Sequence, residues 1–308
     1  ISHRRFFDLP DLVREGDVLV FNDSRVIPAR FYGNRKESGR EIEMLLLEKI
    51  SERKWRALVK PGRRMIAGSE FTVMNHQGAL ATSGTVSDVE ESGTRIVEFF
   101  DEDELRSAGV IPLPPYIHDK LDDAERYQTV YSRKEGSVAA PTAGLHFTPE
   151  ILEKVRKIGA ETVFVTLHIG WDTFRPIKTD DATSHEMHSE AWELSPESAG
   201  AINRAKAEGR RVISVGTTAV RLLENSALLN KSDDRVVAPG RGRVSLFIYP
   251  GFEFKAVDAL ITNFHLPKST LLMMVSAFAG RELAVRVYDE AVSKQYRFYS
   301  FGDAMFFC

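Results

Sequence analysis

A polar loop that runs directly into an apolar segment is the stretch of this chain best suited to chemistry. Residues 262–268 offer an amide at Asn263, an imidazole at His265 and an ammonium at Lys268, and residues 270–279 are almost entirely apolar. The apolar segment is expected to form a buried helix, whose first backbone N–H groups must find partners. The loop and helix start are therefore expected to be either a well-capped core element or an anion-binding site with the helix dipole behind it, and the residue types leave both open.

Histidines gather in loops and at strand ends of the second half of the chain. Five of the eight histidines fall there, namely His146, His168, His185, His188 and His265. Ligands of α/β sheets bind at such places, and the ordinary pKa of histidine suits proton transfer. A lone histidine is more often structural, but five in one set of loops favour an acid–base site. Asp172, after one strand end, is expected either to orient His168 or only to cap a turn.

Two further segments have the composition of ligand-binding turns. Residues 138–147 are mostly small and end near His146, with Thr142 and Gly144 between, which favours close approach of a ligand over a merely tight turn. Residues 216–218, Gly-Thr-Thr, follow an expected strand and open an expected helix, a geometry that suits a carboxylate or a phosphate. The segment lacks the lysine of a P-loop and the three glycines of a dinucleotide fingerprint, so it predicts no nucleotide site.

The composition describes a soluble globular protein of one large domain or two ordinary ones. The 308 residues are 43% hydrophobic and 28% charged, with a net charge of −3. The only cysteine, Cys308, excludes a disulfide framework, Cys-based zinc sites and iron–sulfur clusters, and fits a reducing cytoplasm. His185 and His188 have His-x-x-His spacing without a nearby third ligand, so we expect no metal. No secretory signal or membrane-length apolar run is visible, so we expect a cytoplasmic protein without a membrane partner.

Two patterns of elements are expected to position these groups. The first hundred residues alternate short β-type runs with turn signals, which favours an antiparallel barrel or sandwich. A proline-rich connector at 111–116 marks an expected domain boundary, and beyond it strands alternate with helices, as in a layered α/β domain. Thr148 and Ser195 are expected helix N-caps. The expected strands are 17–21, 26–32, 41–50, 55–60, 70–74, 80–89, 94–100, 161–169, 211–215, 244–249, 256–261 and 296–301, and the expected helices are 102–108, 148–157, 196–208, 217–227, 270–279 and 282–294.

Many short motifs occur in one order along nearly the whole chain. They are Phe21-Asn22-Asp23-Ser24-Arg25 with residues 26–30, and the stretches 112–117, 125–131, 138–148, 165–168, 173–176, 187–190, 215–218, 247–251, 261–280 and 296–305. Together they resemble the S-adenosylmethionine:tRNA ribosyltransferase-isomerases of queuosine biosynthesis. Trp171, Asp172 and Ser245 depart from the family's usual residues, and the first two are expected to narrow the pocket. The family's leading segment is not in this sequence, so we expect a segment before Ile1.

The resemblance implies a reaction and a fold. The ribosyl moiety of S-adenosylmethionine would be transferred to 7-aminomethyl-7-deazaguanine at the wobble position of tRNA and isomerised, giving epoxyqueuosine and releasing adenine and methionine. The implied fold is mixed α/β (α+β), a layered α/β domain of residues 1–27 and 112–308 with an inserted antiparallel β-barrel domain of residues 28–111. The implied partners are tRNA and S-adenosylmethionine as co-substrate, with no metal, and we expect a monomer.

This chemistry assigns expected roles. The sulfonium acidifies the adjacent 5′ carbon, so a neutral base is needed, and adenine leaves readily only when protonated or hydrogen bonded. The expected catalytic residues are His146, His168, His188 and His265, with their individual roles open. The expected S-adenosylmethionine-binding residues are Thr142, Gly144, Gly216, Thr217, Thr218, Asn263 and Lys268. The expected tRNA-binding residues are Arg25, Arg30, Lys60, Arg63 and Arg64, because RNA phosphates attract positive charge.

Two other classes of function are open alternatives. A non-catalytic RNA-binding protein would need no reactive loops in the α/β half, yet those loops are the richest part of the chain. An S-adenosylmethionine-dependent methyltransferase would usually place a glycine-rich loop after its first strand, and the sequence has none there.

Overall fold

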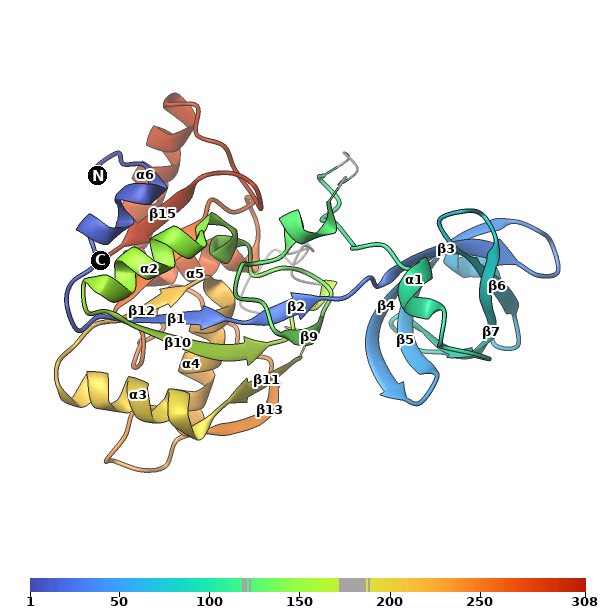
Figure 1. The fold of residues 1–308 in the computed structure, drawn as a ribbon, viewed down its shortest axis with the longest axis horizontal. Coiled ribbons are helices and arrows are strands. Elements are labelled where there is room, and N and C mark those ends of the chain that lie inside the picture. Colours follow the sequence, from blue (N-terminus) through green and yellow to red (C-terminus); the bar gives the residue numbers. More distant parts are fainter. Residues whose placement is uncertain (118–120, 122, 172–186, 188) are drawn as a thin grey trace. The chain divides into compact units, whose positions relative to one another are not determined.

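The computed structural model describes residues 1–117, 121, 123–171, 187 and 189–308. The chain falls into two compact units, one made of Ile1–Arg25 and Leu121–Cys308 and the other of Val26–Lys120 (Figure 1). The first unit is a layered α/β structure and the second contains a closed β-barrel. The predicted fold class, a mixed α/β protein with an antiparallel barrel, is therefore confirmed.

The α/β unit is built on a seven-stranded sheet with the order β13-β11-β10-β1-β12-β14-β15. Its strands are β1 (Val18–Asn22), β10 (Glu161–Leu167), β11 (Glu190–Leu194), β12 (Val212–Val215), β13 (Gly240–Val244), β14 (Ala259–Asn263) and β15 (Ala304–Phe307). β10, β1, β12 and β14 run parallel, whereas β11, β13 and β15 are antiparallel to their neighbours. The carboxyl ends of the four parallel strands therefore meet at one edge of the sheet.

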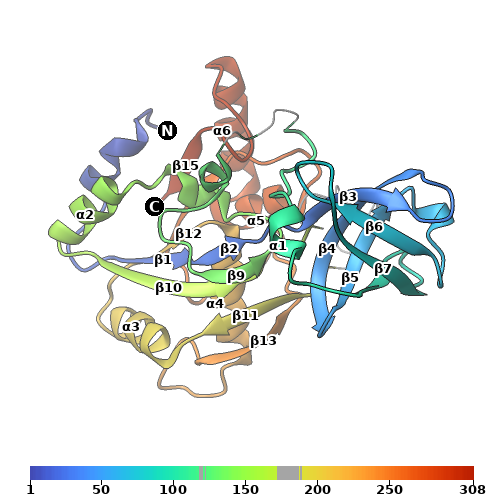
Figure 2. The same ribbon diagram turned by 45° about the vertical axis from the view of Figure 1, so that its right-hand side comes forward.

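Helices cover both faces of this sheet, which explains why its central strand is apolar at every position but the last. Val18 and Val20 of β1 belong to a core cluster that includes side chains of α3 and α4. Leu19 and Phe21 point to the other face, where they join a second cluster with α2. Figure 2 shows α2 and α3 on opposite sides of β1 and β10. The helices are α2 (Pro149–Lys157), α3 (Pro196–Ala207), α4 (Thr217–Leu229), α5 (Thr270–Ala279) and α6 (Arg281–Ser293), with 3₁₀ turns η1 (Phe6–Asp11), η3 (Ala124–Tyr127) and η4 (Thr142–His146).

Two predicted helix starts are confirmed by their caps. The Thr148 hydroxyl accepts a hydrogen bond from the backbone N–H of Ile151 at 3.3 Å, and α2 begins with proline. The Ser195 hydroxyl accepts from the N–H of Ser198 at 3.1 Å, and α3 also begins with proline. In both helices a side-chain oxygen thus satisfies a backbone donor that the helix itself leaves unpaired.

The second unit is a six-stranded closed barrel with the order β3-β4-β5-β8-β7-β6. Its elements are β3 (Arg30–Arg35), β4 (Glu41–Ser51), β5 (Lys54–Lys60), η2 (Gly62–Arg64), β6 (Glu70–Met74), β7 (Leu80–Val89), β8 (Arg95–Phe99) and α1 (Leu105–Ala108). Phe71 and Phe99 fill the interior, with ring centroids 5.6 Å apart. Gly84 is required beside them, because a Cβ there would lie 2.7 Å from the Phe71 ring and 2.4 Å from the Glu98 carbonyl oxygen.

Three predicted strands differ from the structure. The strand predicted at 26–32 is instead β2 (Ser24–Val26), which pairs with β9 (Lys134–Ser137), followed by β3, and Pro28 lies in the break between them. The strand predicted at 244–249 ends where it was expected to begin, because β13 pairs with β11 only up to Val244. The strand predicted at 296–301 is wrong as well. Asp303 accepts from the Arg297 N–H at 2.7 Å and closes a turn there, so β15 starts only at Ala304.

The apolar helix α5 was predicted to be buried, but most of its side chains are only half-buried. Only Met274 and Val275 are buried, and most of its other side chains are half-buried. Met274 belongs to the core beneath the sheet, and Val275 packs in a smaller cluster with Ala284 and Ala291 of α6. Because only these two side chains are buried, the other apolar side chains of α5 stay partly exposed to solvent. Across the described parts of the chain, none of the helices has the length and apolarity needed to span a membrane.

Candidate active site

Asn22 joins three elements at the carboxyl edge of the parallel strands. This buried side chain follows the apolar run of β1. Its Nδ2 donates to the carbonyl of Leu167, at the end of β10, at 2.9 Å, and to the Thr218 hydroxyl, in the first turn of α4, at 3.2 Å. Its Oδ1 accepts from the N–H of Leu167 at 3.0 Å. One amide therefore fixes the strand ends and the helix start relative to one another.

A second amide, Asn263 at the end of β14, connects two predicted site residues. The Thr142 hydroxyl donates to Asn263 Oδ1 at 2.9 Å, and Asn263 Nδ2 donates to His146 Nε2 at 3.0 Å. In this arrangement a neutral His146 carries its proton on Nδ1. The ring stacks on Phe6 with centroids 4.9 Å apart. Burial lowers the pKa of His146, Asp303 raises it and Arg297 lowers it, so the imidazole is neutral near pH 7.

His168 follows β10 and has a buried ring nitrogen without a hydrogen-bond partner among the described residues. Its ring lies against Gly136, where a Cβ would come within 2.9 Å of Cε1 and Nδ1. Nδ1 is buried, and no group of the described chain forms a hydrogen bond with it. Burial lowers the pKa of His168, whereas the charges of Asp23 and Glu193 raise it and Lys134 lowers it. The net result is a neutral imidazole with an unused ring nitrogen.

Asp23 is the buried charge next to these strand ends. It accepts from the Thr166 hydroxyl at 2.7 Å and from Arg133 Nη2 at 2.9 Å. Its backbone carbonyl accepts from the N–H groups of Arg133 and Lys134. The carboxylate is thus held in place from several sides and contributes a fixed negative charge that favours a protonated His168.

The start of α4 has the form expected of an anion site. Gly216 has a φ of 90° and, having no side chain, provides no cap for the helix. Thr217 and Thr218 are buried in the first turn. A Cβ on Gly216 would lie 3.6 Å from that of Ala143, which places η4 beside this helix start. The predicted residues Thr142, His146, Asn263, Gly216 and Thr218 are therefore brought into one region by the contacts of η4, β12 and β14.

Two other predicted residues, Gly144 and His265, have structural explanations, and a third, Lys268, is exposed. Gly144 lies against Tyr131, where a Cβ would be 1.9 Å from the phenol oxygen, so packing alone requires glycine. His265 is buried, its Nε2 shares a hydrogen bond of 2.8 Å with the Thr262 hydroxyl, and burial lowers its pKa to about 4. These contacts favour a core histidine. Lys268 is exposed, and the adjacent α5 is capped by Ser269, whose hydroxyl accepts from the Leu272 N–H at 3.2 Å.

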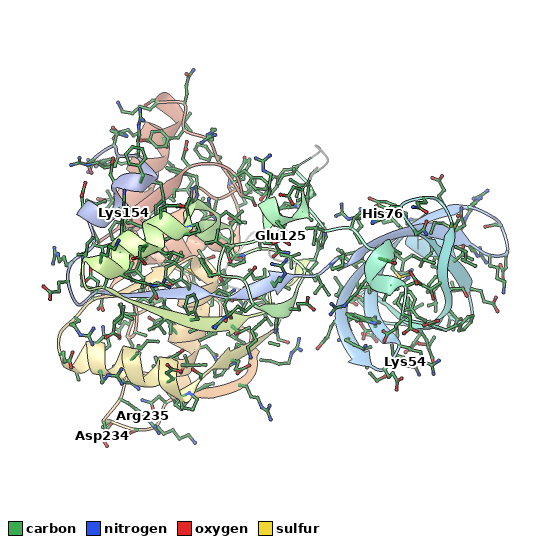
Figure 3. All side chains as sticks on the ribbon, viewed as in Figure 1. Lys54, His76, Glu125, Lys154, Asp234 and Arg235 are labelled. Carbon is green, nitrogen blue, oxygen red and sulfur yellow. The ribbon has the colours of Figure 1, made fainter. Side chains whose placement is uncertain are left out.

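The predicted tRNA-binding residues divide into paired and exposed groups. Arg25 forms an ion pair with Glu125, which is labelled in Figure 3, and donates to the Ser132 hydroxyl at 2.9 Å. In the barrel unit, Arg30 forms an ion pair with Glu43, with Arg30 Nε 3.3 Å from Glu43 Oε1. The residues more open to solvent are Lys60, at the end of β5, and Arg63 and Arg64, in the connection between β5 and β6.

His188, predicted as catalytic, lies outside the described residues, as do His185 and Asp172. Within the described residues, no group of three His, Cys, Asp or Glu side chains could hold a metal ion.

Sequence reasoning missed several polar residues at the same edge. Asn22 and Asp23 come directly after a buried strand, a signal that points to the carboxyl edge of a sheet. Arg221 and Glu190 form a buried ion pair near this edge. A charged residue inside the largely buried helix α4 was the available signal for Arg221.

Fold and site together define an α/β protein with polar, titratable groups at the carboxyl ends of its parallel strands and a separate β-barrel unit. The chain belongs to the family described as queuosine biosynthesis protein, whose model matches residues 1–307.

Known relatives agree with this assignment over almost the full chain. The S-adenosylmethionine:tRNA ribosyltransferase-isomerase of Natranaerobius thermophilus is 50% identical over 99% of this chain and 88% of that protein. The protein of the same name from Symbiobacterium thermophilum is also 50% identical, with the same coverage. A crystal structure of S-adenosylmethionine tRNA ribosyltransferase from Thermotoga maritima matches with a TM-score of 0.52 and 36% identity, covering 99% of this chain and 87% of that one.

Proposed function

We propose that the carboxyl-edge site transfers and isomerises the ribosyl moiety of S-adenosylmethionine onto 7-aminomethyl-7-deazaguanine at the wobble position of tRNA. The chain is an S-adenosylmethionine:tRNA ribosyltransferase-isomerase of queuosine biosynthesis. The products in this proposal are epoxyqueuosine in tRNA, adenine and methionine. The observation that supports the site is the pair of imidazoles, His146 and His168, whose pKa values burial lowers so that both are neutral.

His168 is the base in this proposal. Its Nδ1 is unoccupied by any described group, so it can accept the proton that the sulfonium acidifies on the 5′ carbon of the ribose. Asp23 stabilises the imidazolium that results, because its charge raises the pKa of His168. Burial lowers the pKa of His168 and Asp23 raises it, so the imidazole is neutral before proton transfer and its positive charge is stabilised afterwards.

His146 is the hydrogen-bond donor to the leaving adenine. Because its Nε2 accepts from Asn263, its Nδ1 carries the proton that a ring nitrogen of adenine can accept. The Thr142 hydroxyl donates to Asn263 Oδ1, which keeps Asn263 Nδ2 facing His146 Nε2 and leaves His146 Nδ1 as the donor to adenine. The start of α4, at Gly216, Thr217 and Thr218, binds the anionic end of S-adenosylmethionine.

The exposed cations of the barrel unit contact RNA phosphates. Lys60 ends β5, and Arg63 and Arg64 lie in the connection that follows. Arg95 holds the backbone of this connection, because it donates to the carbonyl of Gly62 and, at 3.1 Å, to that of Met65. A fixed backbone keeps three positive side chains together, which favours counterion release on RNA binding.

A product assay tests the proposal. Purified protein is mixed with S-adenosylmethionine and an anticodon stem-loop that carries the deazaguanine, and adenine, methionine and modified RNA are quantified together. We expect equal amounts of all three and no S-adenosylhomocysteine. His168→Gln is expected to lower kcat by about 10²- to 10⁴-fold, the usual loss for a general base. His76→Gln, on an exposed turn of the barrel unit, is the control. Release of S-adenosylhomocysteine, or full activity of His168→Gln, would contradict the proposal.

A further inference from the structure

A buried ion pair joins α4 to the start of β11, beside the carboxyl end of β10. Arg221 Nη1 donates to Glu190 Oε2, and both side chains are almost fully buried, 6% and 7% exposed. Glu190 Oε1 accepts from the N–H of Gly170 at 2.8 Å, and Arg221 Nε donates to the carbonyl of Leu246 at 3.2 Å. The guanidinium is therefore held by contacts from several segments of the α/β unit.

One donor of this guanidinium is left over. Arg221 Nη2 is buried, and it forms no hydrogen bond with any of the described residues. A buried N–H without an acceptor is unfavourable, more so on a charged group, and such groups in folded proteins usually have a partner. A bound ligand could therefore supply the acceptor that Nη2 lacks.

The unsatisfied donor belongs to the region already described. Arg221 lies one helical turn after Thr217, and long side chains on a helix lean toward its N-terminus. The guanidinium thus lies toward the start of α4, which has no side-chain cap at Gly216. Gly170, which holds its partner Glu190, comes two residues after His168. An uncapped helix start and an unpaired guanidinium donor both attract a negative group.

We infer that Arg221, together with the start of α4, binds the α-carboxylate of the methionine part of S-adenosylmethionine. This inference rests on the proposed function and names a residue for one end of its substrate. The charge balance favours an amino-acid carboxylate over a phosphate. Glu190 already neutralises Arg221, so a ligand that brings its own ammonium costs less to bury than a dianion.

Binding measurements with matched ligands test the assignment without turnover. S-adenosylhomocysteine, its decarboxylated analogue and 5′-methylthioadenosine are titrated calorimetrically into the full chain. The first two differ only in the carboxylate, and the third lacks the whole amino-acid end. Wild-type protein is expected to prefer S-adenosylhomocysteine over the decarboxylated analogue by about tenfold to a hundredfold, as for loss of one charge-assisted hydrogen bond.

Two variants test whether the preference for the carboxylate-bearing ligand depends on Arg221. Arg221→Lys keeps the positive charge, but its ammonium lacks the planar set of N–H donors with which a guanidinium can bind Glu190 and a ligand carboxylate at once. The double variant Arg221→Met with Glu190→Gln removes both charges together, so that no buried charge is left alone, and the amide oxygen of the new side chain keeps an acceptor for Gly170. Both are expected to bind the two ligands within about threefold of each other, while the affinity for 5′-methylthioadenosine stays near that of wild type.

Arg211→Lys is the matched control. Arg211 also forms a bidentate pair with a buried carboxylate, Asp17, but at the amino end of β1 and β12, the opposite edge of the sheet. It is expected to keep the wild-type preference. If either folded Arg221 variant also keeps it, or loses affinity equally for all three ligands, the assignment is wrong and the pair is only structural. A wild-type protein that binds none of the three contradicts the proposed function itself, and this assignment with it.

Discussion

The side-chain amide of Asn263 donates to Nε2 of His146 at 3.0 Å, joining residues that are 117 positions apart in the sequence. The same amide accepts from Thr142, so its orientation is set from both ends. A histidine in this contact has one defined tautomer when neutral. The site thus has its proton donor selected before any substrate is bound.

Asn263→Asp tests this selection. A carboxylate at position 263 can only accept, so it forces a proton onto Nε2 of His146, and its charge raises the pKa of that imidazole. We expect kcat to fall at least about tenfold and the acid limb of its pH profile to move to higher pH. Thr142→Val, which removes only the hydroxyl contact to Oδ1, should give a smaller loss with an unshifted profile. An Asn263→Asp enzyme with the wild-type pH profile would show that the tautomer is irrelevant.

His265 makes stability depend on pH in a defined window. Its pKa is about 4 in the folded protein because of burial, below the ordinary value of 6.5. The unfolded chain therefore binds more protons between these two values, so the free energy of unfolding falls as pH drops from 6.5 to 4. The contribution is fully present above pH 6.5 and is worth on the order of 3 kcal/mol at most.

Urea unfolding of wild type and His265→Gln between pH 4 and 7 measures this contribution. Glutamine can retain the contact with Thr262 but does not titrate, so the variant should show a flatter dependence of the unfolding midpoint on pH. His146 and His168, whose pKa values are also lowered, keep part of the slope in the same direction. Parallel curves for the two proteins would mean that His265 is not a buried neutral group.

Gly144 is expected to be intolerant of even one methyl group. A Cβ there would lie 1.9 Å from the Tyr131 hydroxyl, so Gly144→Ala must displace η4 or Tyr131. We expect a loss of about 1–3 kcal/mol in the free energy of unfolding, typical of overpacking. Adding Tyr131→Phe should recover part of it. Gly200→Ala, inside α3 with its nearest contact at 3.5 Å, is the control and should be neutral or stabilising by up to about 1 kcal/mol. Equal melting curves for both alanine variants would disprove the clash.

Replacing Lys60, Arg63 and Arg64 by Gln should weaken tRNA binding and reduce its salt dependence. Each lost phosphate contact lowers the slope of log K against log salt by about 0.7 to 0.9. Fluorescence anisotropy with an anticodon stem-loop over a salt series measures this slope. The control is Lys36→Gln with Lys54→Gln, two lysines of the barrel unit that pair with Glu70 and Glu98. An unchanged slope in the triple variant would remove this connection from the RNA-binding surface.

Local signals in the sequence predicted most elements well. The strands expected at 70–74 and 80–89 coincide with β6 and β7, because turn residues separate runs of clear alternation. The aromatic run at 296–301 misled, because Tyr296 and Phe298 pack with Phe264 instead of forming a strand. Alternating aromatics indicate burial, and only the partner across the fold decides whether a strand results.

The site was predictable only as far as residue type and strand position allow. His146 and Asn263 were both candidates, but their contact depends on η4 lying beside the end of β14. His265, two residues from Asn263, points instead to Thr262, and no local feature distinguishes it from His146. Arg221 is one of two charged residues in α4, and its role depends on Glu190, which comes from another element.

The Asn22 contacts also bear on how the chain acquires its structure during synthesis. Asn22 is made 145 positions before its partner Leu167, and the strands of the barrel unit, contiguous in sequence, are all made in between. The barrel can therefore close while β1 still has no neighbour to pair with. An apolar segment held open for that interval is the part of the nascent polypeptide that chaperones have most reason to shield from aggregation.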